Sequence, residues 1–137
     1  DFQIGKAQEV YKGTDVTIIA CGHMVWKSIE AAKVLTEKGV SVELINMHTI
    51  KPLDVSAVLS SVSKTGCVVT AEEHMANGGL GEAVAQVLSK NHPCPHEFVA
   101  VDDSFGESGK PMDLLDKYGL GTSNIVEAVE KAIERKS

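Results

Sequence analysis

Three ionisable residues, Glu72, Glu73 and His74, begin one residue after a β-branched run at residues 67–70. A short apolar run bounded by turn residues predicts a buried strand, and open α/β sheets bind ligands beyond the carboxyl ends of such strands. Two carboxylates beside an imidazole could divide acid and base roles, because neighbouring charges push pKa values apart. A single acidic loop supplies no second wall for a pocket, however, so a polar interface or a solvated loop is the favoured interpretation.

A glycine turn separates this acidic cluster from an apolar-periodic run, with Gly78, Gly79 and Gly81 at its centre. A glycine-rich turn between a strand and a helix is also typical of dinucleotide sites. Here Val84 stands where the third glycine of that motif would be, and the long loop at residues 71–77 replaces the tight turn that cradles a pyrophosphate. We therefore expect a structural turn, in which Gly79 or Gly81 adopts a positive φ.

Two further groups of residues have the types, but not the spacing, of ligand sites. Lys110 lies just before Pro111 at a predicted helix start, where backbone donors could help it to hold an anion. The glycines around it lack the spacing of a phosphate-binding loop, so a solvated lysine is favoured. His92, Cys94 and His96 are metal-ligand types, but the prolines between them extend the chain and splay the side chains, so no metal site is expected.

Length and composition predict one soluble domain that spans residues 1–137. Hydrophobic residues make up 43% of the chain, its net charge is −6, and its 13 basic residues are scattered, which argues against nucleic acid and anionic membranes as partners. No apolar run reaches the roughly 20 residues that cross a bilayer. Three cysteines without a Cys-x-x-Cys pair fit a reducing, cytoplasmic setting. Because the chain opens without Met, we expect a piece of a longer polypeptide.

Alternating strand and helix patterns predict an α/β fold with a mostly parallel sheet. Asp54 is expected to cap the second helix and Gly66 to end it. Residues 1–14 are expected to form a leading segment with a short edge strand. The other predicted strands span residues 16–21, 42–45, 67–70 and 98–101. The predicted helices span about residues 25–38, 55–65, 80–88 and 111–118, and a last one runs from about residue 122 onward.

Several blocks of sequence, in order along the chain, resemble the C-terminal domain of transketolase. The resemblance runs from end to end of the chain. The block that contains Lys110 favours transketolase over two related families, the deoxyxylulose-phosphate synthases and the β subunits of 2-oxo acid dehydrogenases. The blocks are residues 1–7, 49–54, 72–74 with 78–84, 105–115 and 117–120.

This resemblance implies a three-layer sandwich, in which helices cover both faces of a mostly parallel five-stranded sheet. It also implies a parent transferase of the pentose phosphate pathway, which moves two-carbon ketol units between sugar phosphates with thiamine diphosphate and magnesium. In that family both cofactors, and the residues that grip the substrate, belong to domains that precede this one. No catalytic, cofactor-binding or metal-binding residue is therefore assigned here, and the isolated domain is expected to be inactive.

The role expected for this chain is packing against the remaining transketolase domains or subunit, within a homodimer of the whole enzyme. Glu72, Glu73 and His74 would face that neighbour, and substitution of both glutamates should affect assembly more than folding. One alternative is the C-terminal domain of a deoxyxylulose-phosphate synthase or of a 2-oxo acid dehydrogenase β subunit. The other is a free-standing module that holds a small anion at the glycine turn of residues 78–81 and Lys110.

Overall fold

The chain is built around a five-stranded sheet with the strand order β1-β3-β2-β4-β5. The structure, a computed structural model, describes residues 6–48, 50, 52–73, 79–101 and 121–137. Strands β2 to β5 are parallel, and β1 pairs antiparallel with β3 at one edge, so the predicted α/β class and edge strand are confirmed. The strands are β1 (Gln8–Tyr11), β2 (Val16–Ala20), β3 (Val42–Asn46), β4 (Val68–Glu73) and β5 (His96–Val101).

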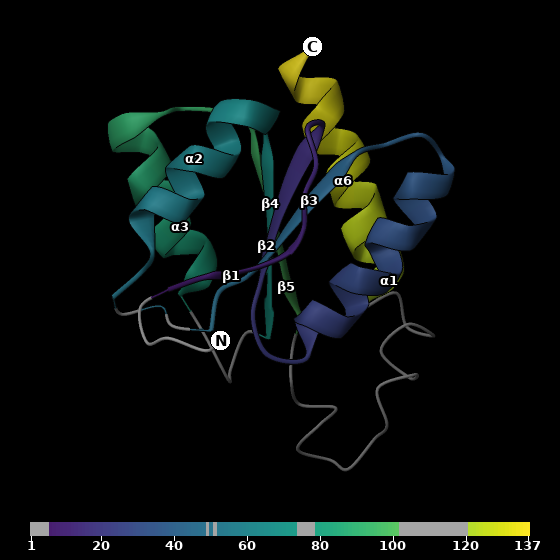
Figure 1. Ribbon diagram of the computed structural model, residues 1–137, viewed down its shortest axis with the longest axis horizontal. Helices are drawn as coiled ribbons and strands as arrows, with labels where there is room; N and C mark the ends of the chain where they lie inside the picture. Colours follow the sequence, from purple (N-terminus) through teal and green to yellow (C-terminus); the bar gives the residue numbers. More distant parts are fainter. Residues whose placement is uncertain (1–5, 49, 51, 74–78, 102–120) are drawn as a thin grey trace.

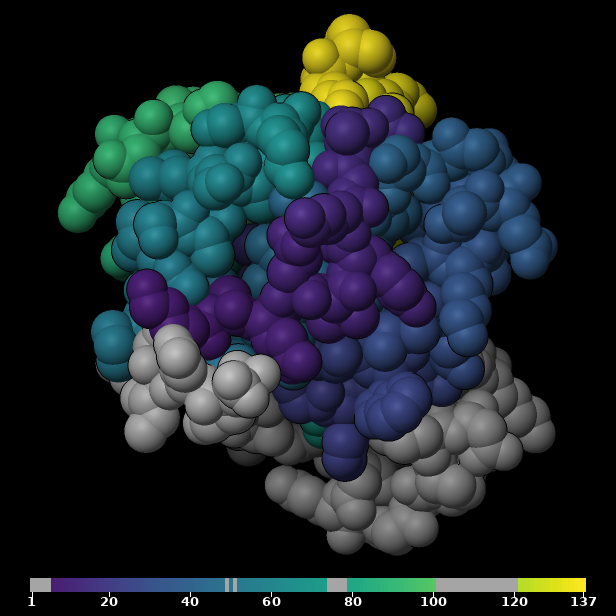
Figure 2. All heavy atoms as spheres, viewed as in Figure 1, coloured from purple at the N-terminus to yellow at the C-terminus, as the bar shows by residue number. Residues whose placement is uncertain are grey.

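Helices cover both faces of this sheet and complete a three-layer sandwich (Figure 1). One pair of helices packs on one face and the second pair on the other. Seen from the β1 edge, the purple β1 segment lies between the teal α2 and the blue α1 (Figure 2). The first face carries α1 (Met24–Glu37) and α6 (Thr122–Lys136), and the second carries α2 (Val55–Thr65) and α3 (Leu80–Asn91).

The sheet separates two hydrophobic cores, because successive residues of a strand point to opposite faces. Ile18 of β2 lies in the core under α1 and α6, whereas its neighbour Ile19 lies in the core under α2 and α3. All five residues of β2 are fully buried, as expected for a central parallel strand that is covered on both sides. The continuous apolar run that predicted this strand is therefore a consequence of its central place.

Local signals set the ends of α2 as predicted. The Asp54 carboxylate accepts the Ala57 N–H at 3.2 Å, and Gly66 ends the helix with a φ of 79°. The predicted helix at residues 111–118 lies outside the described residues, as do Lys110, His74 and Gly78. Among the residues that the structure describes, no helix is both long and apolar enough to cross a membrane.

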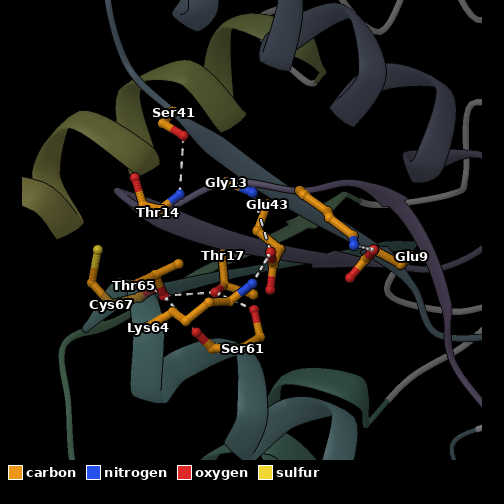
Figure 3. Close-up of polar contacts among 11 residues, drawn as sticks. Glu9, Gly13, Thr14, Thr17, Ser41, Glu43, Ser61, Lys64, Thr65 and Cys67 are labelled. Atoms are coloured by element: carbon orange, nitrogen blue, oxygen red, sulfur yellow. Dashed lines mark hydrogen bonds and ion pairs between the residues drawn. The ribbon is translucent and has the colours of Figure 1, made fainter.

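A polar network closes the sheet at the amino ends of its strands (Figure 3). The buried Glu43 carboxylate accepts hydrogen bonds from Lys64 Nζ at 2.6 Å and from the Gly13 N–H at 3.1 Å. Close by, the Thr17 hydroxyl lies 2.7 Å from the hydroxyls of both Ser61 and Thr65. These contacts fasten the turn between β1 and β2, and the helix α2, to the start of the sheet.

Gly13 has no room for a side chain in this network. A Cβ atom at that position would lie 2.3 Å from the carbonyl carbon of Val42, which is backbone and cannot swing aside. The turn therefore approaches β3 so closely that only glycine fits, and this approach brings the Gly13 N–H within reach of Glu43.

Glu43 should contribute stability that depends on pH. Burial by itself would raise the pKa of this carboxyl group, but hydrogen bonds from Lys64, Ser61 and the Gly13 N–H outweigh burial and hold the pKa below its ordinary value. A carboxyl group with a lowered pKa stabilises the folded state above its unfolded pKa, near 4.3, and this contribution is lost as the pH falls through the folded pKa.

We therefore predict that Glu43→Gln lowers the free energy of unfolding by about 1–2 kcal/mol at pH 7, since the half-exposed Lys64 can regain water when it loses its partner. The difference from the parent protein should shrink steadily below about pH 4. Urea unfolding between pH 7 and pH 3 measures it, with the exposed Glu134→Gln as the matched control. A difference that does not change with pH would contradict the assignment.

Candidate functional site

The acidic cluster lies at the carboxyl end of β4, and two of its members belong to the strand itself. The sequence predicted a strand that stops at Thr70 and a charged loop after it, whereas β4 continues to Glu73. The extension is held by β5, because Glu72 pairs with Ala100 and Glu73 with Val101. Successive strand residues point to opposite faces, so the two carboxylates serve different layers of the sandwich.

Glu72 points toward α3 and caps its first turn. Its carboxylate accepts the Leu80 N–H at 3.1 Å and the Gly81 N–H at 2.8 Å, and only 7% of the residue is exposed. The first amides of a helix have no partners within the helix, and the helix dipole favours a negative charge there. The prediction that Glu72 faces a neighbouring domain is therefore corrected, because its side chain is buried and bound within this domain.

Glu73 performs the matching task for α1 on the other face. Its carboxylate accepts the backbone N–H of His23, the residue that precedes α1, at 3.0 Å, and His23 Nδ1 lies 3.5 Å away. The side chain of Glu73 is 14% exposed and that of His23 is 67% exposed, so this pair reaches the surface. Of the three residues predicted to face a neighbouring domain, Glu73 remains a candidate, and His74 lies outside the described residues.

His23 is a member of the site, although no role was assigned to it from the sequence. It follows β2 in the chain, and β2 pairs in parallel with β4, so the carboxyl ends of these two strands lie side by side. Its position just after a predicted strand, at the start of a helix, was the available signal. The connection to Glu73, which is 50 residues away in sequence, needed the strand order.

The glycine turn is confirmed as a structural requirement at both described positions. Gly79 precedes α3 with a φ of 108°, in the region that favours glycine, as expected for at least one of the pair. Gly81 serves a different purpose, since a Cβ there would lie 2.5 Å from the ring of Phe98 and 3.1 Å from Thr70 Oγ1. The close approach lets α3 pack directly against the edge of the sheet.

Burial holds the thiol of Cys21, beside this site, and the imidazole of His96, at the start of β5, in their neutral forms. Burial, and then the charges of Glu72 and Glu73, raise the pKa of Cys21 to about 12, which makes its thiol a poor nucleophile. Burial lowers the pKa of His96 to about 4, and its Nε2 lies 2.9 Å from Thr70 Oγ1. Within the described part of the chain, no group of three or more side chains is placed to hold a metal ion.

The interactions observed at this site stabilise the fold. Both carboxylates bind backbone amides at helix N-termini, so neither is poised to take a proton from a substrate. The helix N-terminus most suited to an anion, that of α3, already binds the Glu72 carboxylate. Among the described residues at this edge, the Glu73–His23 pair reaches the surface, and Trp26 in the first turn of α1 is 71% exposed.

Comparison with known proteins shows where this arrangement occurs. The sequence profile of the family described as "Transketolase, C-terminal domain" matches residues 5–125. The chain belongs to this family. The match includes every described strand and the turn from Glu72 to Gly81, so the family resemblance that the sequence suggested is confirmed.

Relatives within the transketolase family are similar over the whole of this chain. It is 46% identical to the 6-deoxy-6-sulfo-D-fructose transketolase subunit SqwH of Clostridium sp. (strain MSTE9), over 100% of this chain and 42% of that protein. It is 32% identical to the 1-deoxy-D-xylulose-5-phosphate synthase of Desulforudis audaxviator (strain MP104C), over 98% of this chain and 22% of that protein. The chain thus spans less than half the length of these relatives.

A solved structure supports the same conclusion. The fold superposes with a TM-score of 0.85 on a protein described as "Split gene transketolase, inactive beta4 tetramer", which is 45% identical. The similarity covers 99% of this chain and 44% of that one. The three-layer architecture described above is therefore that of a transketolase C-terminal domain.

The capping role of Glu72 in this transketolase domain predicts a difference between two adjacent glutamates. Glu72→Gln should lower the free energy of unfolding by about 1–3 kcal/mol, because a buried amide group repels one of the two N–H donors. Glu73→Gln should cost less than about 1 kcal/mol, since its partner His23 is exposed to water. Urea denaturation of the two variants measures the contrast, and equal stabilities would show that Glu72 is not the cap.

The two glycines should respond differently to a compensating change. Gly79→Ala should destabilise the domain by about 1–2 kcal/mol through its positive φ. Gly81→Ala should cost about 1–3 kcal/mol through its clash with Phe98, and much of this cost should disappear when Phe98 is also changed to Ala. A double-mutant cycle by thermal unfolding tests this, because Phe98→Ala should bring no relief to Gly79→Ala.

Proposed function

We propose that residues 1–137 serve as the noncatalytic C-terminal domain of a transketolase. The whole enzyme would transfer two-carbon ketol units between sugar phosphates, with thiamine diphosphate and magnesium bound by its remaining domains. The role of this domain would be packing, both against those domains or a partner subunit and within a homodimer, in the cytoplasm. The chain covers 42% and 44% of the two most similar proteins described above, which supports the assignment of catalysis to other domains.

One observation carries the proposal that this domain is noncatalytic. The acidic residues that best suit catalysis, Glu72 and Glu73, are both bound to backbone amides at the starts of helices within the domain. A general base must reach the proton that it removes, and these carboxylates are turned to other donors. Because these carboxylates bind the starts of α1 and α3, they support a role in stabilising the fold at the carboxyl edge of the sheet.

The described residues also do not fit the cofactor of this family. A diphosphate needs free backbone donors, such as those at a helix N-terminus, and magnesium needs carboxylate oxygens. The N-terminus of α3 is filled by Glu72, and the described residues contain no group of three or more side chains placed to hold a metal ion. No step of the reaction is therefore assigned to this domain.

The surface at this edge supports a packing role. Trp26 is 71% exposed in the first turn of α1, and the Glu73–His23 pair lies at the start of the same helix. A large aromatic side chain beside a partly exposed ion pair is a common arrangement at protein interfaces, in which the aromatic residue supplies affinity and the charges set orientation. We propose that the remaining transketolase domains cover Trp26.

The alternative function, a free-standing module that binds small anions, is less well supported. Of its two proposed elements, the glycine turn presents its helix amides to Glu72, and Lys110 lies outside the described residues. An anion at this turn would have to displace a buried carboxylate from the amides that it caps.

The deciding experiment uses this chain with and without the remaining domains of its transketolase. We predict that the chain alone neither binds thiamine diphosphate in calorimetry nor consumes a ketose phosphate, and that mixing it with the remaining domains restores turnover. Trp26→Ala should weaken that association at least about tenfold, as expected for an exposed aromatic anchor. Val34→Ala, at an exposed apolar residue of the same helix, is the matched control.

Two outcomes would overturn this proposal. Stoichiometric cofactor binding or turnover by the chain alone would place the chemistry in this domain. Loss of turnover in Glu73→Gln, with association and cofactor affinity unchanged, would show that the carboxylate is catalytic.

A further inference from the structure

The second edge of the sheet, formed by β5, offers backbone groups that have no partner among the described residues. The Val68 N–H donates to the carbonyl of Pro95, which fixes the alternation along β5. In a parallel pair, alternate residues turn both backbone groups toward the neighbouring strand. The backbone groups of Phe98 and Ala100 therefore point away from β4, and no described residue bonds to them.

The start of this edge is closed by a side chain, and no hydrogen bond from a described residue closes the rest. The Arg135 guanidinium, from the last turn of α6, donates to the outward carbonyl of His96 and pairs with Glu97. Farther along, Phe98 is 53% exposed, and its ring stacks on that of His96 with centroids 4.0 Å apart. An open strand with an exposed aromatic residue is a ready template for another strand.

A groove of about 280 Å³ runs between this open edge and α6. Four-residue steps back from Arg135 along α6 lead to Lys131 and then to Glu127, and both line the groove together with Asn124. At the start of β5, Arg135 and Glu97 neutralise each other, so the groove has Lys131 on the side toward the start of β5 and Glu127 toward its end. The sign of the charge thus changes along the strand. When the strand meets an antiparallel copy, the positive part of each groove lies beside the negative part of the other.

We propose that β5 is a self-association surface, on which the β5 strand of a second copy of this chain pairs antiparallel and joins the two sheets into one. This inference rests on the packing role proposed above and names the surface that would carry the contact between copies. The contact is two-fold symmetric, as is usual for homodimers, with Val99 opposite Val99 of the second copy.

This register satisfies both the backbone and the side chains. It sets Phe98 opposite Ala100 of the second copy, so that each such pair exchanges hydrogen bonds through groups that have no partner in the part of the chain that the structure describes. A large ring then packs beside a small side chain. On the α6 side, Glu127 of one copy lies toward Lys131 of the other. Arg135 stops the pairing at His96, which prevents slippage to a longer register.

Sedimentation of the 137-residue chain over a range of concentrations tests the proposal. The parent protein should form a reversible dimer with a dissociation constant below about 100 µM. Ala100→Pro should raise that constant at least about tenfold without loss of the fold, because the N–H that proline removes points outward. Monomer at every concentration, or an Ala100→Pro variant that dimerises like the parent, overturns the proposal.

A charge exchange keeps the test decisive even if Ala100→Pro does not fold. Glu127→Lys should weaken dimerisation about fivefold or more, since it sets like charges together twice in a symmetric contact. Adding Lys131→Glu should restore it, and Glu134→Lys, with the same change of charge on the same helix, should have no effect. Equal effects of Glu127→Lys and Glu134→Lys, or no rescue, overturn the proposal. Association here is scored without the remaining domains, so its failure is distinct from a failure of the proposed function.

Discussion

The last two residues of β4 hold the three layers of this domain together. Glu72 and Glu73 are consecutive, so they point to opposite faces of the sheet, and each binds backbone amides at the start of a helix. One carboxylate fixes α3 and the other fixes α1, at points where the helix dipole favours negative charge. Since β4 is held by β2 and β5 on its two sides, a rigid strand sets the position of both helices.

This constraint explains how the acidic cluster at the carboxyl edge of the sheet is used, because its described carboxylates bind helix amides. The carboxyl edge of the sheet has helix amides that could bind an anion, and β4 supplies that anion from its own side chains. The groups left for other contacts are those at the margin of the site, Glu73 with His23 and the exposed Trp26. This arrangement supports the proposal that the domain docks beside an active site in the remaining domains.

The opposite end and the two edges of the sheet complete the picture. At the amino ends of the strands, Glu43 binds Lys64 and the turn at Gly13, a position where only glycine fits. One edge is short and antiparallel at β1, whereas the other, β5, has backbone groups without a partner among the described residues, beside a charged groove. The α1 start and the β5 edge are therefore two surfaces that could meet partners.

The sequence by itself determined the α/β class, the order of the elements, the glycine turn and the ends of α2, because these depend on local patterns and caps such as Asp54 and Gly66. It did not determine that β4 continues to Glu73, or that Glu72 is buried. Those features arise where β5 extends the pairing of β4 and where His23 meets Glu73 across 50 residues. Only tertiary packing decided them. A carboxylate in a loop is a free charge, whereas the same carboxylate becomes a helix cap when packing places it beside unpaired amides.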